Sequence, residues 1–493
     1  MIVSANAEWE SGQELHRDYE TREDIQKHHD LRNAVVCRRL FGDAPKWPLF
    51  TIRGGNPNKG CKVSKYLCVG LICLLMLAVL WVPPAMPQSS ETKMRPAATE
   101  ALDQGNVFIL EGPSSVGGQL GKDQEAKGAF YPVPRLSERY FSFKNRLEKD
   151  YGFSFGFDYN ALFQAASDSL GEDKAAGGVF RAYGQWTLVG KDSENTGTLV
   201  YKVENRHRLG TDIAPKGLAS EIGYAGLTAV TFSNIGWALT NLYWNQHLLN
   251  NRLAFVGGIV DVTDYIDVYG LVNPWTDFNN YAFTTNPTIP APDQGLGAAV
   301  RVMPTENIYF LAGIADANGD PTNPEDSINS FFSEEEFFTH VEVGWVSSWE
   351  RRFSDNIHLT IWHADERKQA QVPDGWGAAF SFSRLFAETW EPFFRAGYSE
   401  DGGALWERSV SAGFGYYPGN KSDVLGVGFN WSRPAEDVFG PGMDDQYTAE
   451  IYYRFQVMKV LSVTPDVQII IDPVLNPQES SMWVFCLRAR LAL

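Results

Sequence analysis

The C-terminal stretch SMWVFCLRARLAL, residues 481–493, alternates between two kinds of side chain. Mostly large apolar residues take every second position, and smaller or charged residues, including Arg488 and Arg490, take the positions between. Because successive side chains of a β-strand point to opposite sides of the sheet, the pattern predicts a strand with one apolar and one charged face. Three earlier segments repeat the alternation, at 422–432, 444–457 and 460–472.

Alternation alone leaves open which face is in contact with water. In a soluble sandwich the apolar face packs against a second sheet, whereas in a membrane barrel it is in contact with lipid. A charge on the lipid face near the centre of the bilayer costs about 2–4 kcal/mol. In a barrel, the charged residues of these segments must therefore face a watery lumen.

The connections after Tyr151 distinguish the two architectures. We predict sixteen strands, at 153–163, 176–189, 195–207, 235–246, 251–261, 293–303, 306–316, 336–348, 355–364, 375–384, 388–397, 406–417, 422–432, 444–457, 460–472 and 481–493. The connections between them are alternately long and short. This is typical of an outer-membrane barrel, which has short periplasmic turns and long outer loops.

The expected fold is thus all-β, a transmembrane antiparallel up-and-down barrel of about sixteen strands. A further strand over 226–233 stays open and would give eighteen. Residues 136–149 have apolar side chains at helical spacing, and Gly152 can end a helix there, so a short N-terminal helix is expected before the first strand. This helix would lie at the periplasmic mouth or be a simple surface helix.

The barrel domain is expected to take residues 136–493. Residues 67–82 are uncharged and follow three lysines, as in a secretory signal peptide, which we assign to 59–87. A short uncleaved anchor is the alternative, although a spanning helix needs roughly 20 apolar residues. We expect 1–58 to be absent from the mature protein, because translation starts later, and 88–135 to have little structure.

Composition restricts the partners and the redox chemistry. Four of the five cysteines precede residue 74, so only Cys486 remains after cleavage and no intrachain disulfide is expected. Residues 1–87 hold 11 of the 42 basic and 9 of the 60 acidic residues, which leaves a net charge of −20 on the remainder. Such acidity argues against nucleic acid as a partner and fits acidic outer loops or a pore that disfavours anions.

The sequence lacks the usual catalytic and cofactor motifs, including HExxH, GxSxG, CxxC and the P-loop consensus. His358 and His363 are five residues apart on a predicted strand and therefore point to opposite faces. Residues 316–320 begin like a calcium loop, but Pro321 and Ser327 stand where that loop needs Gly and Glu. We therefore predict no catalytic residue, no cofactor and no metal site.

The connection 262–292 is the longest, and it combines carboxylates, aromatic side chains and prolines. Folded inward, it would narrow the pore and offer aromatic rings to the C–H faces of sugars and charged groups to their hydroxyls. Folded outward, it would have no role in the pore. Its candidate sugar contacts are Asp264, Asp267 and Trp275.

Three stretches of the chain are similar to one known family. They are NRLEKDYGFSFGFDYNA (145–161), NRLAFVGGIVDVTDYIDVYG with NPTIPAPDQGLGAAVRVM (within 251–303), and AEIYYRFQVMKVLSVTPDVQIIIDPVLNPQESSMWVFCLRARLAL (449–493). They resemble the carbohydrate-selective porins of Gram-negative outer membranes, the OprB type. The resemblance covers roughly 136–493 and is weakest in 164–250.

The resemblance implies a sixteen-stranded barrel through which sugars diffuse across the outer membrane. Two positions depart from the family pattern, since the chain ends in Leu493 where such barrels prefer Phe, and Cys486 stands where Gly is common. The alternation of side chains along each predicted strand, which we call strand parity, separately provides the pore-lining candidates. They are Lys202, Glu204, Arg206, Glu342, Glu450, Arg454, Asp466, Arg488 and Arg490.

The leading interpretation is a passive, sugar-preferring porin of a Gram-negative outer membrane, reached through the signal peptide and the periplasm. Its expected partners are small sugars as permeants, outer-membrane lipid and the barrel-assembly machinery, with a homotrimer as a further expectation. Two other classes stay open. A barrel enzyme such as a lipase would need a Ser/His pair on its lipid-facing rim, and a secreted glycan-binding β-protein would stay soluble without detergent.

Overall fold

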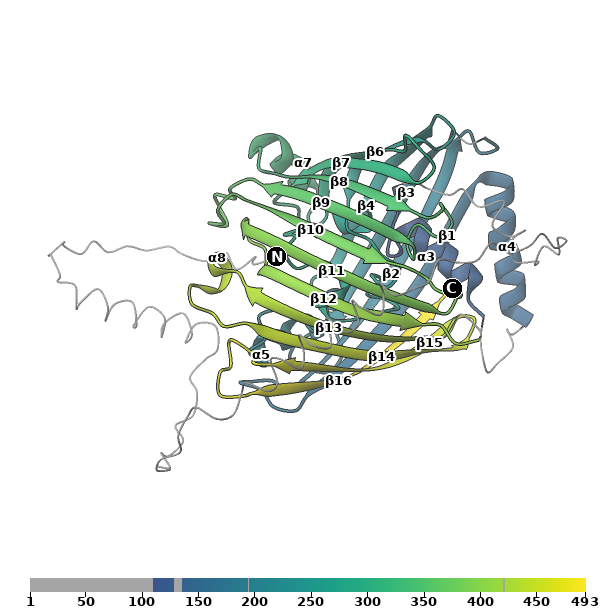
Figure 1. Cartoon of the computed structure of the whole chain (residues 1–493). Helices are drawn as coiled ribbons and strands as arrows, with labels where there is room; N and C mark the ends of the chain where they lie inside the picture. The colour runs from purple at the N-terminus through teal and green to yellow at the C-terminus, as the bar shows by residue number, and fades with distance from the viewer. Residues whose placement is uncertain (1–109, 128–134, 194, 420–421) are drawn as a thin grey trace, which may run out of the picture. The chain divides into compact units, whose positions relative to one another are not determined.

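The computed structural model describes residues 110–127, 135–193, 195–419 and 422–493. Sixteen antiparallel strands close into one barrel, in which each strand pairs with its neighbours in the chain and β1 pairs with β16 (Figure 1). This confirms the predicted up-and-down architecture. The strands are β1 (Phe153–Ala166), β2 (Lys174–Val189), β3 (Gly197–Arg208), β4 (Gly236–Leu248), β5 (Leu253–Val260), β6 (Gly295–Val302), β7 (Ile308–Asp316), β8 (Phe337–Val346), β9 (Asn356–Ala364), β10 (Gly375–Ser383), β11 (Trp390–Asp401), β12 (Trp406–Tyr416), β13 (Val424–Pro434), β14 (Gln446–Met458), β15 (Leu461–Ile471) and β16 (Ser481–Ala492).

Each predicted strand corresponds to one observed strand, and 226–233 contains no strand, so the alternative of eighteen strands is wrong. The largest difference is in β11, which extends to Asp401. The β11–β12 connection is therefore only 402–405, and the strict alternation of long and short connections fails there. Gly402 and Gly403, with φ of +76° and +80°, supply the left-handed backbone that this tight turn needs.

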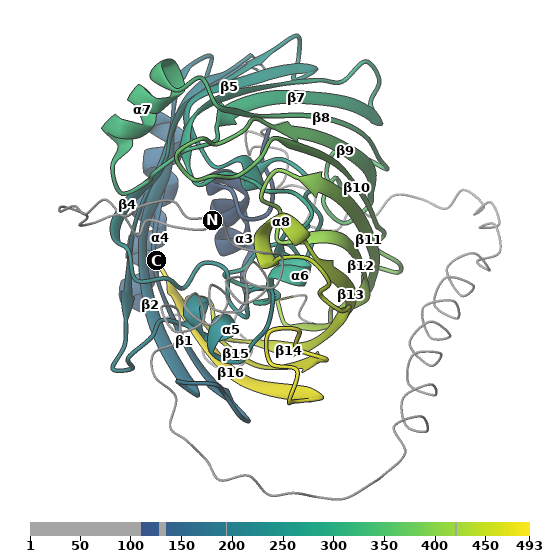
Figure 2. The same cartoon turned by 90° about the vertical axis from the view of Figure 1, so that its left-hand side faces the viewer.

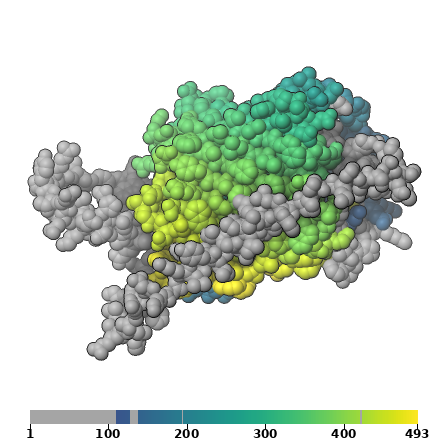
Figure 3. Space-filling model, viewed as in Figure 1, coloured from purple at the N-terminus to yellow at the C-terminus, as the bar shows by residue number. Residues whose placement is uncertain are grey.

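The alternation in sequence becomes a separation between the outside and the inside of the barrel. In β16, Trp483, Phe485 and Leu487 are 43%, 53% and 51% exposed, whereas Arg488 and Arg490 are almost fully buried. Figure 3 shows one side of this wall of strands in space-filling form. A soluble sandwich would bury these apolar side chains against a second sheet, which this single closed barrel lacks.

The chain end completes the ring of strands. The backbone N–H of Leu493 donates to the carbonyl of Phe157 (2.8 Å), and the N–H of Phe157 donates to the carbonyl of Leu493 (3.1 Å). Backbone pairing therefore extends to Leu493, the position where the barrels that the sequence resembles prefer Phe.

Exposed tryptophans lie near both ends of the strands. One set is close to the short turns, and we call it the periplasmic belt: Trp186, Trp345 and Trp390. The other set is close to the opposite rim: Trp237, Trp376 and Trp483. Such aromatic girdles mark the two membrane interfaces of a transmembrane barrel.

The helices occupy different places. Helix α4 (Arg135–Tyr151), which confirms the helix expected over 136–149, lies at the rim of the short turns (Figure 1). Helix α3 (Val116–Glu125) lies within the ring of strands (Figure 2). The shorter helices belong to connections between strands: α5 (Leu218–Glu221), α6 (Tyr281–Thr284), α7 (Pro324–Ser333), α8 (Glu436–Phe439), and the 3₁₀ turns η2 (Pro215–Gly217) and η3 (Val262–Asp264). Within the described part of the chain, we find no helix with the length and hydrophobicity of a membrane span.

Sequence reasoning did not find α3, which lies in a segment expected to have little structure. Its sequence VGGQLGKDQE is rich in glycine and has no clear apolar period. The glycines serve close packing, since a Cβ at Gly117 would lie 2.0 Å from the Glu111 carboxylate and one at Gly118 would lie 2.2 Å from the Gly112 carbonyl. Ser115 caps the helix by accepting a hydrogen bond from the N–H of Gly118 (3.2 Å).

Candidate functional site: the filled interior of the barrel

Two connections fold into the barrel. We call residues 261–294, between β5 and β6, the inner loop, and residues 209–235, between β3 and β4, the inner segment. Their helices α6 and α5 lie with α3 inside the ring of strands in Figure 2. The connection 262–292, for which inward and outward folding were both considered, therefore folds inward.

All twelve predicted site residues are buried inside the barrel. Nine lie on strands: Lys202, Glu204, Arg206, Glu342, Glu450, Arg454, Asp466, Arg488 and Arg490. Three lie in the inner loop: Asp264, Asp267 and Trp275. Chain segments inside the barrel supply partners to most of these strand charges. Their roles in lining the pore or contacting sugars stay predictions.

One end of the inner loop is held by β8, β9 and β11. The Asp267 carboxylate forms an ion pair with Arg395, and His358 Nε2 lies 3.1 Å from Asp267 Oδ1. The backbone N–H of Asp267 donates to Glu342 Oε2 (2.8 Å), and Glu342 also accepts from Tyr309 (2.8 Å). Burial raises the pKa of Asp267, but Arg395 and His358 outweigh it and hold that pKa below its usual value. The loop therefore carries a buried, paired carboxylate here.

The other end is held by β14, β15 and β16. Glu450 accepts hydrogen bonds from the backbone N–H groups of Asn279 (2.6 Å) and Asn280 (3.0 Å), and the Asn279 amide donates to Asp466 (3.0 Å). Arg488 donates to the carbonyls of Pro274 (2.7 Å) and Asp277 (2.6 Å) and to Asn279 Oδ1 (2.7 Å). Strand charges thus satisfy backbone groups that an irregular loop would otherwise leave unpaired.

Asp277 joins three elements. Its carboxylate lies 2.9 Å from Lys122 Nζ of α3 and 3.2 Å from Arg454 Nη1 of β14. Burial raises the pKa of Asp277, but the nearby Lys122 and Arg454 outweigh it, so that pKa is below its usual value. Burial lowers the pKa of Lys122 to about 8, against the opposing effect of Asp277.

Helix α3 is also tied directly to the barrel wall. Its Asp123 accepts two hydrogen bonds from Arg490 (2.6 and 2.9 Å) and one from Tyr183 (2.8 Å). Arg490 in turn pairs with Asp158 (2.7 Å), which also pairs with Arg181. A network of buried charges therefore connects α3 with β1, β2 and β16.

A further carboxylate of the inner loop faces β3 and β4. Asp264 Oδ2 lies 3.5 Å from Lys202 Nζ and accepts from the Asn241 amide (3.2 Å). Burial raises the pKa of Asp264 to about 6, more than Lys202 lowers it. On the same β3 strand, Arg206 Nε donates to Glu204 (2.7 Å), so this pair is satisfied within the wall itself.

The pKa of Asp264 predicts a dependence of loop packing on pH. The packed loop binds the Asp264 proton more tightly than a released loop, whose carboxyl has a pKa near 3.8. The stabilisation is therefore complete below about pH 3.8 and is lost as the pH rises through about 6. We expect current fluctuations of single channels to increase from pH 4 to pH 7, and Asp264→Asn to make this increase much smaller. An equal increase in wild type and Asp264→Asn would contradict the assignment.

Trp275 is packed on both the wall and the inner segment. The guanidinium of Arg181 lies 4.0 Å from the centre of its ring, and Phe232 of the inner segment lies 5.8 Å away between ring centres. With 3% of its surface exposed, the indole now stabilises the packed interior. Its predicted contact with sugars would require this packing to open.

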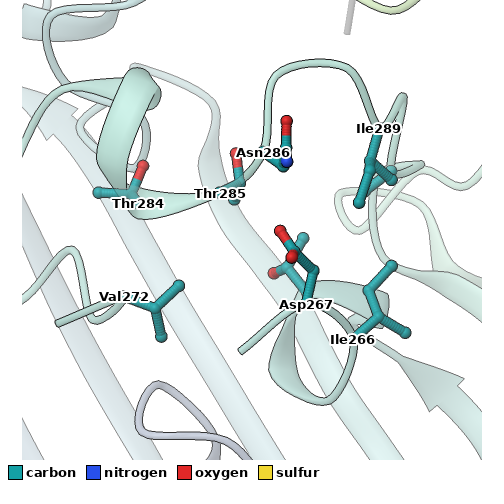
Figure 4. A pocket seen from close by; sticks show the side chains of 9 residues that line it. Ile266, Asp267, Val272, Thr284, Thr285, Asn286 and Ile289 are labelled. Atoms are coloured by element: carbon teal, nitrogen blue, oxygen red, sulfur yellow. The ribbon is translucent and has the colours of Figure 1, made fainter. Parts of the chain in front are cut away.

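A pocket lies beside the inner loop. Its free volume is about 280 Å³ including the solvent at its mouth, and it combines aliphatic side chains with hydroxyl, amide and carboxylate groups. In Figure 4, the Asp267 carboxylate points into this space across from Thr285 and Asn286, while Ile266 and Ile289 form an apolar side. The pocket therefore places apolar and polar groups side by side at the inner loop.

Several residues that hold the interior together were not predicted. Asp158, Arg181 and Arg395 are inward-facing charges on β1, β2 and β11, and strand parity alone could have found them. Lys122 and Asp277 lie outside the strands, where no period in the sequence shows which way a side chain points. Among the described residues, no group of three or more His, Cys, Asp or Glu side chains is placed to hold a metal ion.

The closed sixteen-stranded barrel, its two tryptophan girdles and its inward-folded loop define a porin-type outer-membrane protein. A model of the carbohydrate-selective porin, OprB family, matches residues 141–492. Since this is well over half of the chain, the protein belongs to that family. It forms a sugar-preferring channel of the outer membrane.

One solved structure supports the fold, and two others are less similar to the chain. The high-pH structure of OprB from Pseudomonas putida is 14% identical and has a TM-score of 0.58, over 75% of this chain and 99% of that one. The low-pH structure of the same protein is 13% identical with a TM-score of 0.43, over 75% and 100%. A variant of the Rh. blastica porin is 12% identical with a TM-score of 0.41, over 69% and 100%. No curated protein sequence matches the chain.

Proposed function

We propose that this porin passes small sugars by passive diffusion through a lumen whose width is set by the packed inner loop. The observation that carries the proposal is the position of that loop, which is held on one side by Arg395 and on the other by Glu450 and Arg488. A barrel of sixteen strands otherwise leaves a wide aqueous channel. A loop fixed on both sides of such a barrel narrows it at a defined place.

Selection for sugars would come from width and from the chemistry beside the inner loop. Residues 88–493 carry a net charge of −20, which in this proposal disfavours anionic solutes in the channel. The pocket beside Asp267, Thr285 and Asn286 offers hydrogen-bonding groups next to aliphatic side chains. In this proposal, the buried strand charges hold the loop in position, and the groups at its free surface contact the permeant.

The proposal makes the protein a channel rather than an enzyme, in line with its family and fold. Outer-membrane lipid surrounds the apolar wall, and the barrel-assembly machinery inserts it after export directed by the signal peptide at 59–87. The predicted signal peptide and translation start lie outside the described residues. Association as a homotrimer is part of the same proposal, and crosslinking of the protein in native membranes tests it.

Replacing Arg454 with Ala tests the role of the strand charges. Arg454 ties the inner loop to a periplasmic turn, because it donates to the carbonyls of Thr276 (3.3 Å) and Ser422 (3.0 Å) as well as pairing with Asp277. Each hydrogen bond of a charged group contributes about 1.5–3 kcal/mol, so the loop should loosen and single-channel conductance should rise. Arg433→Ala, which removes a partly exposed pair with Asp445, is the control. Unchanged conductance and sugar flux in Arg454→Ala would remove this residue from the set.

A further inference from the structure

Helix α4 has a place and a pattern that the channel function does not use. It packs at the rim of the short turns, where the Tyr140 and Phe155 rings meet edge to face at 6.4 Å and Lys144 Nζ lies 5.2 Å from the centre of the Phe155 ring. Its Glu148 also accepts a hydrogen bond from Gln124 of α3 (3.2 Å). At the same rim, Lys459 Nζ of the β14–β15 turn lies 4.6 Å from the centre of the Phe141 ring of the helix. The helix therefore lies at the end of the barrel that carries the short turns, in contact with both the wall and α3 (Figure 1).

The depth of α4 in the membrane follows from a contact with the periplasmic belt. Trp186 Nε1 donates to the carbonyl of Tyr151, the last residue of the helix (3.1 Å). The next residue, Gly152, has φ of +69° and its N–H donates to the Glu148 carbonyl (2.8 Å), which ends the helix at this point. Because tryptophan girdles lie at the level of the lipid headgroups, α4 ends at that level.

The exposed side of α4 carries a patch that we call the Arg–Phe–Arg patch: Arg139, Phe143 and Arg146. The three residues are spaced by four and three, so they are neighbours on one side of the helix. All three are exposed, and Phe143 is 46% exposed although it is a large apolar side chain. Asp150 lies four residues after Arg146, on the same side of the helix, and is the acidic residue nearest to the patch.

The charge of α4 is opposite to that of the whole protein. The helix contains five basic and three acidic residues, within a chain whose net charge is −18. A helix in the plane of a membrane interface places apolar side chains among the acyl chains and its cations at lipid phosphates. A basic site on an acidic protein fits an anionic partner.

We propose that α4 is an in-plane membrane helix whose Arg–Phe–Arg patch binds anionic phospholipid headgroups of the periplasmic leaflet. Phe143 enters the region between headgroups and acyl chains. Arg139 and Arg146 each lie at a lipid phosphate. The helix thereby fixes the barrel against the leaflet at the point where the chain enters β1.

Spin labels on the full-length barrel in lipid nanodiscs test the depth of the helix. Phe143→Cys reports on the patch, and Asn145→Cys, also exposed but on the other side of the helix, is the matched control. Cys486 is buried. Wild-type protein treated with the same spin label measures the signal that comes from native cysteines. We expect relaxation of the label at 143 to be enhanced more by oxygen than by a water-soluble nickel chelate, and the reverse at 145. Equal access of the nickel chelate to both sites would overturn the proposal.

The lipid class is tested by charge reversal. We compare wild type with Arg139→Glu/Arg146→Glu and measure the retention of phosphatidylglycerol relative to phosphatidylethanolamine by native mass spectrometry. The control is Lys174→Glu/Lys368→Glu, which makes the same change of net charge at exposed side chains of the opposite rim. Since each basic residue near an anionic surface contributes about 1 kcal/mol, the preference should fall about ten-fold or more in the first variant and persist in the control.

Heat-dependent migration in detergent gels confirms that each variant keeps a folded barrel. No preference for phosphatidylglycerol in wild type, or the same loss in the control variant, would overturn the assignment of anionic lipid. The conductance and sugar block of the channel are independent of this result. A failure of the α4 proposal is thus separable from a failure of the proposed function.

Discussion

Asp277→Asn should loosen the inner loop, which carries this residue, from both α3 and β14. The carboxylate is buried between Lys122 and Arg454, and the amide keeps its shape but removes its charge. Breaking a buried ion pair by neutralising one partner costs about 3–5 kcal/mol, because the other charge stays buried without compensation. The expected result is a higher and noisier single-channel conductance, with faster hydrogen exchange in 116–125 and 261–294.

The matched control for this variant is Asp445→Asn. Asp445 also pairs with an arginine, Arg433, but the two side chains are 27% and 41% exposed, respectively. Such a pair contributes about 0–1 kcal/mol, so conductance and exchange in the interior should stay as in wild type. If Asp277→Asn leaves exchange in α3 and the inner loop unchanged, Asp277 does not join these elements.

Shortening the inner loop should have the largest effect on conductance. Val260 and Gly295 are paired at the ends of β5 and β6, so a short glycine–serine turn can replace 265–290 and leave the eight-residue ladder of the two strands intact. The strand charges freed by this change would then be hydrated by water in the lumen rather than buried without partners. Because a sixteen-stranded barrel without a packed loop holds a wide channel, conductance should increase on the order of two-fold or more.

The control shortens the β7–β8 connection, which carries α7 and lies at the rim of the long connections. Phe332 and Ile328 of α7 are 69% and 43% exposed, so this helix has a side that faces away from the barrel interior. We expect its removal to leave conductance unchanged. Equal conductance of the two shortened proteins and wild type would show that the inner loop does not set the width of the pore.

The fold could be predicted because its determinant is local. In a strand every second residue faces the same side, so the pattern Trp483, Phe485, Leu487 against Arg488 and Arg490 assigns outside and inside without any knowledge of distant contacts. The strand order then follows from the connections, since neighbours in an up-and-down barrel are neighbours in sequence. The predicted end of β11 was wrong, because its backbone pairs with β10 as far as Asp401, four residues beyond the predicted end at 397.

The filled interior could not be predicted in the same way. Parity shows that Arg454 and Arg488 point inward, but it cannot show whether water or another part of the chain meets them. Their partners, Asp277 and Pro274, are more than 170 residues away in sequence and lie in a loop without a period. Helix α3 was missed because its glycines, needed for close packing, remove the apolar repeat by which helices are found.

Titration of single-channel current with sugars tests the central claim most directly. The protein is placed in a planar bilayer, and glucose is compared with an uncharged polyether of the same hydrodynamic size. The account predicts that glucose reduces the current of wild type along a saturating curve. The polyether should reduce the current only in proportion to the conductivity of the solution. In the protein with a shortened inner loop, the reduction of the current by glucose should not saturate. Identical, linear reduction by both solutes in wild type would contradict a sugar-preferring passage formed by the packed loop.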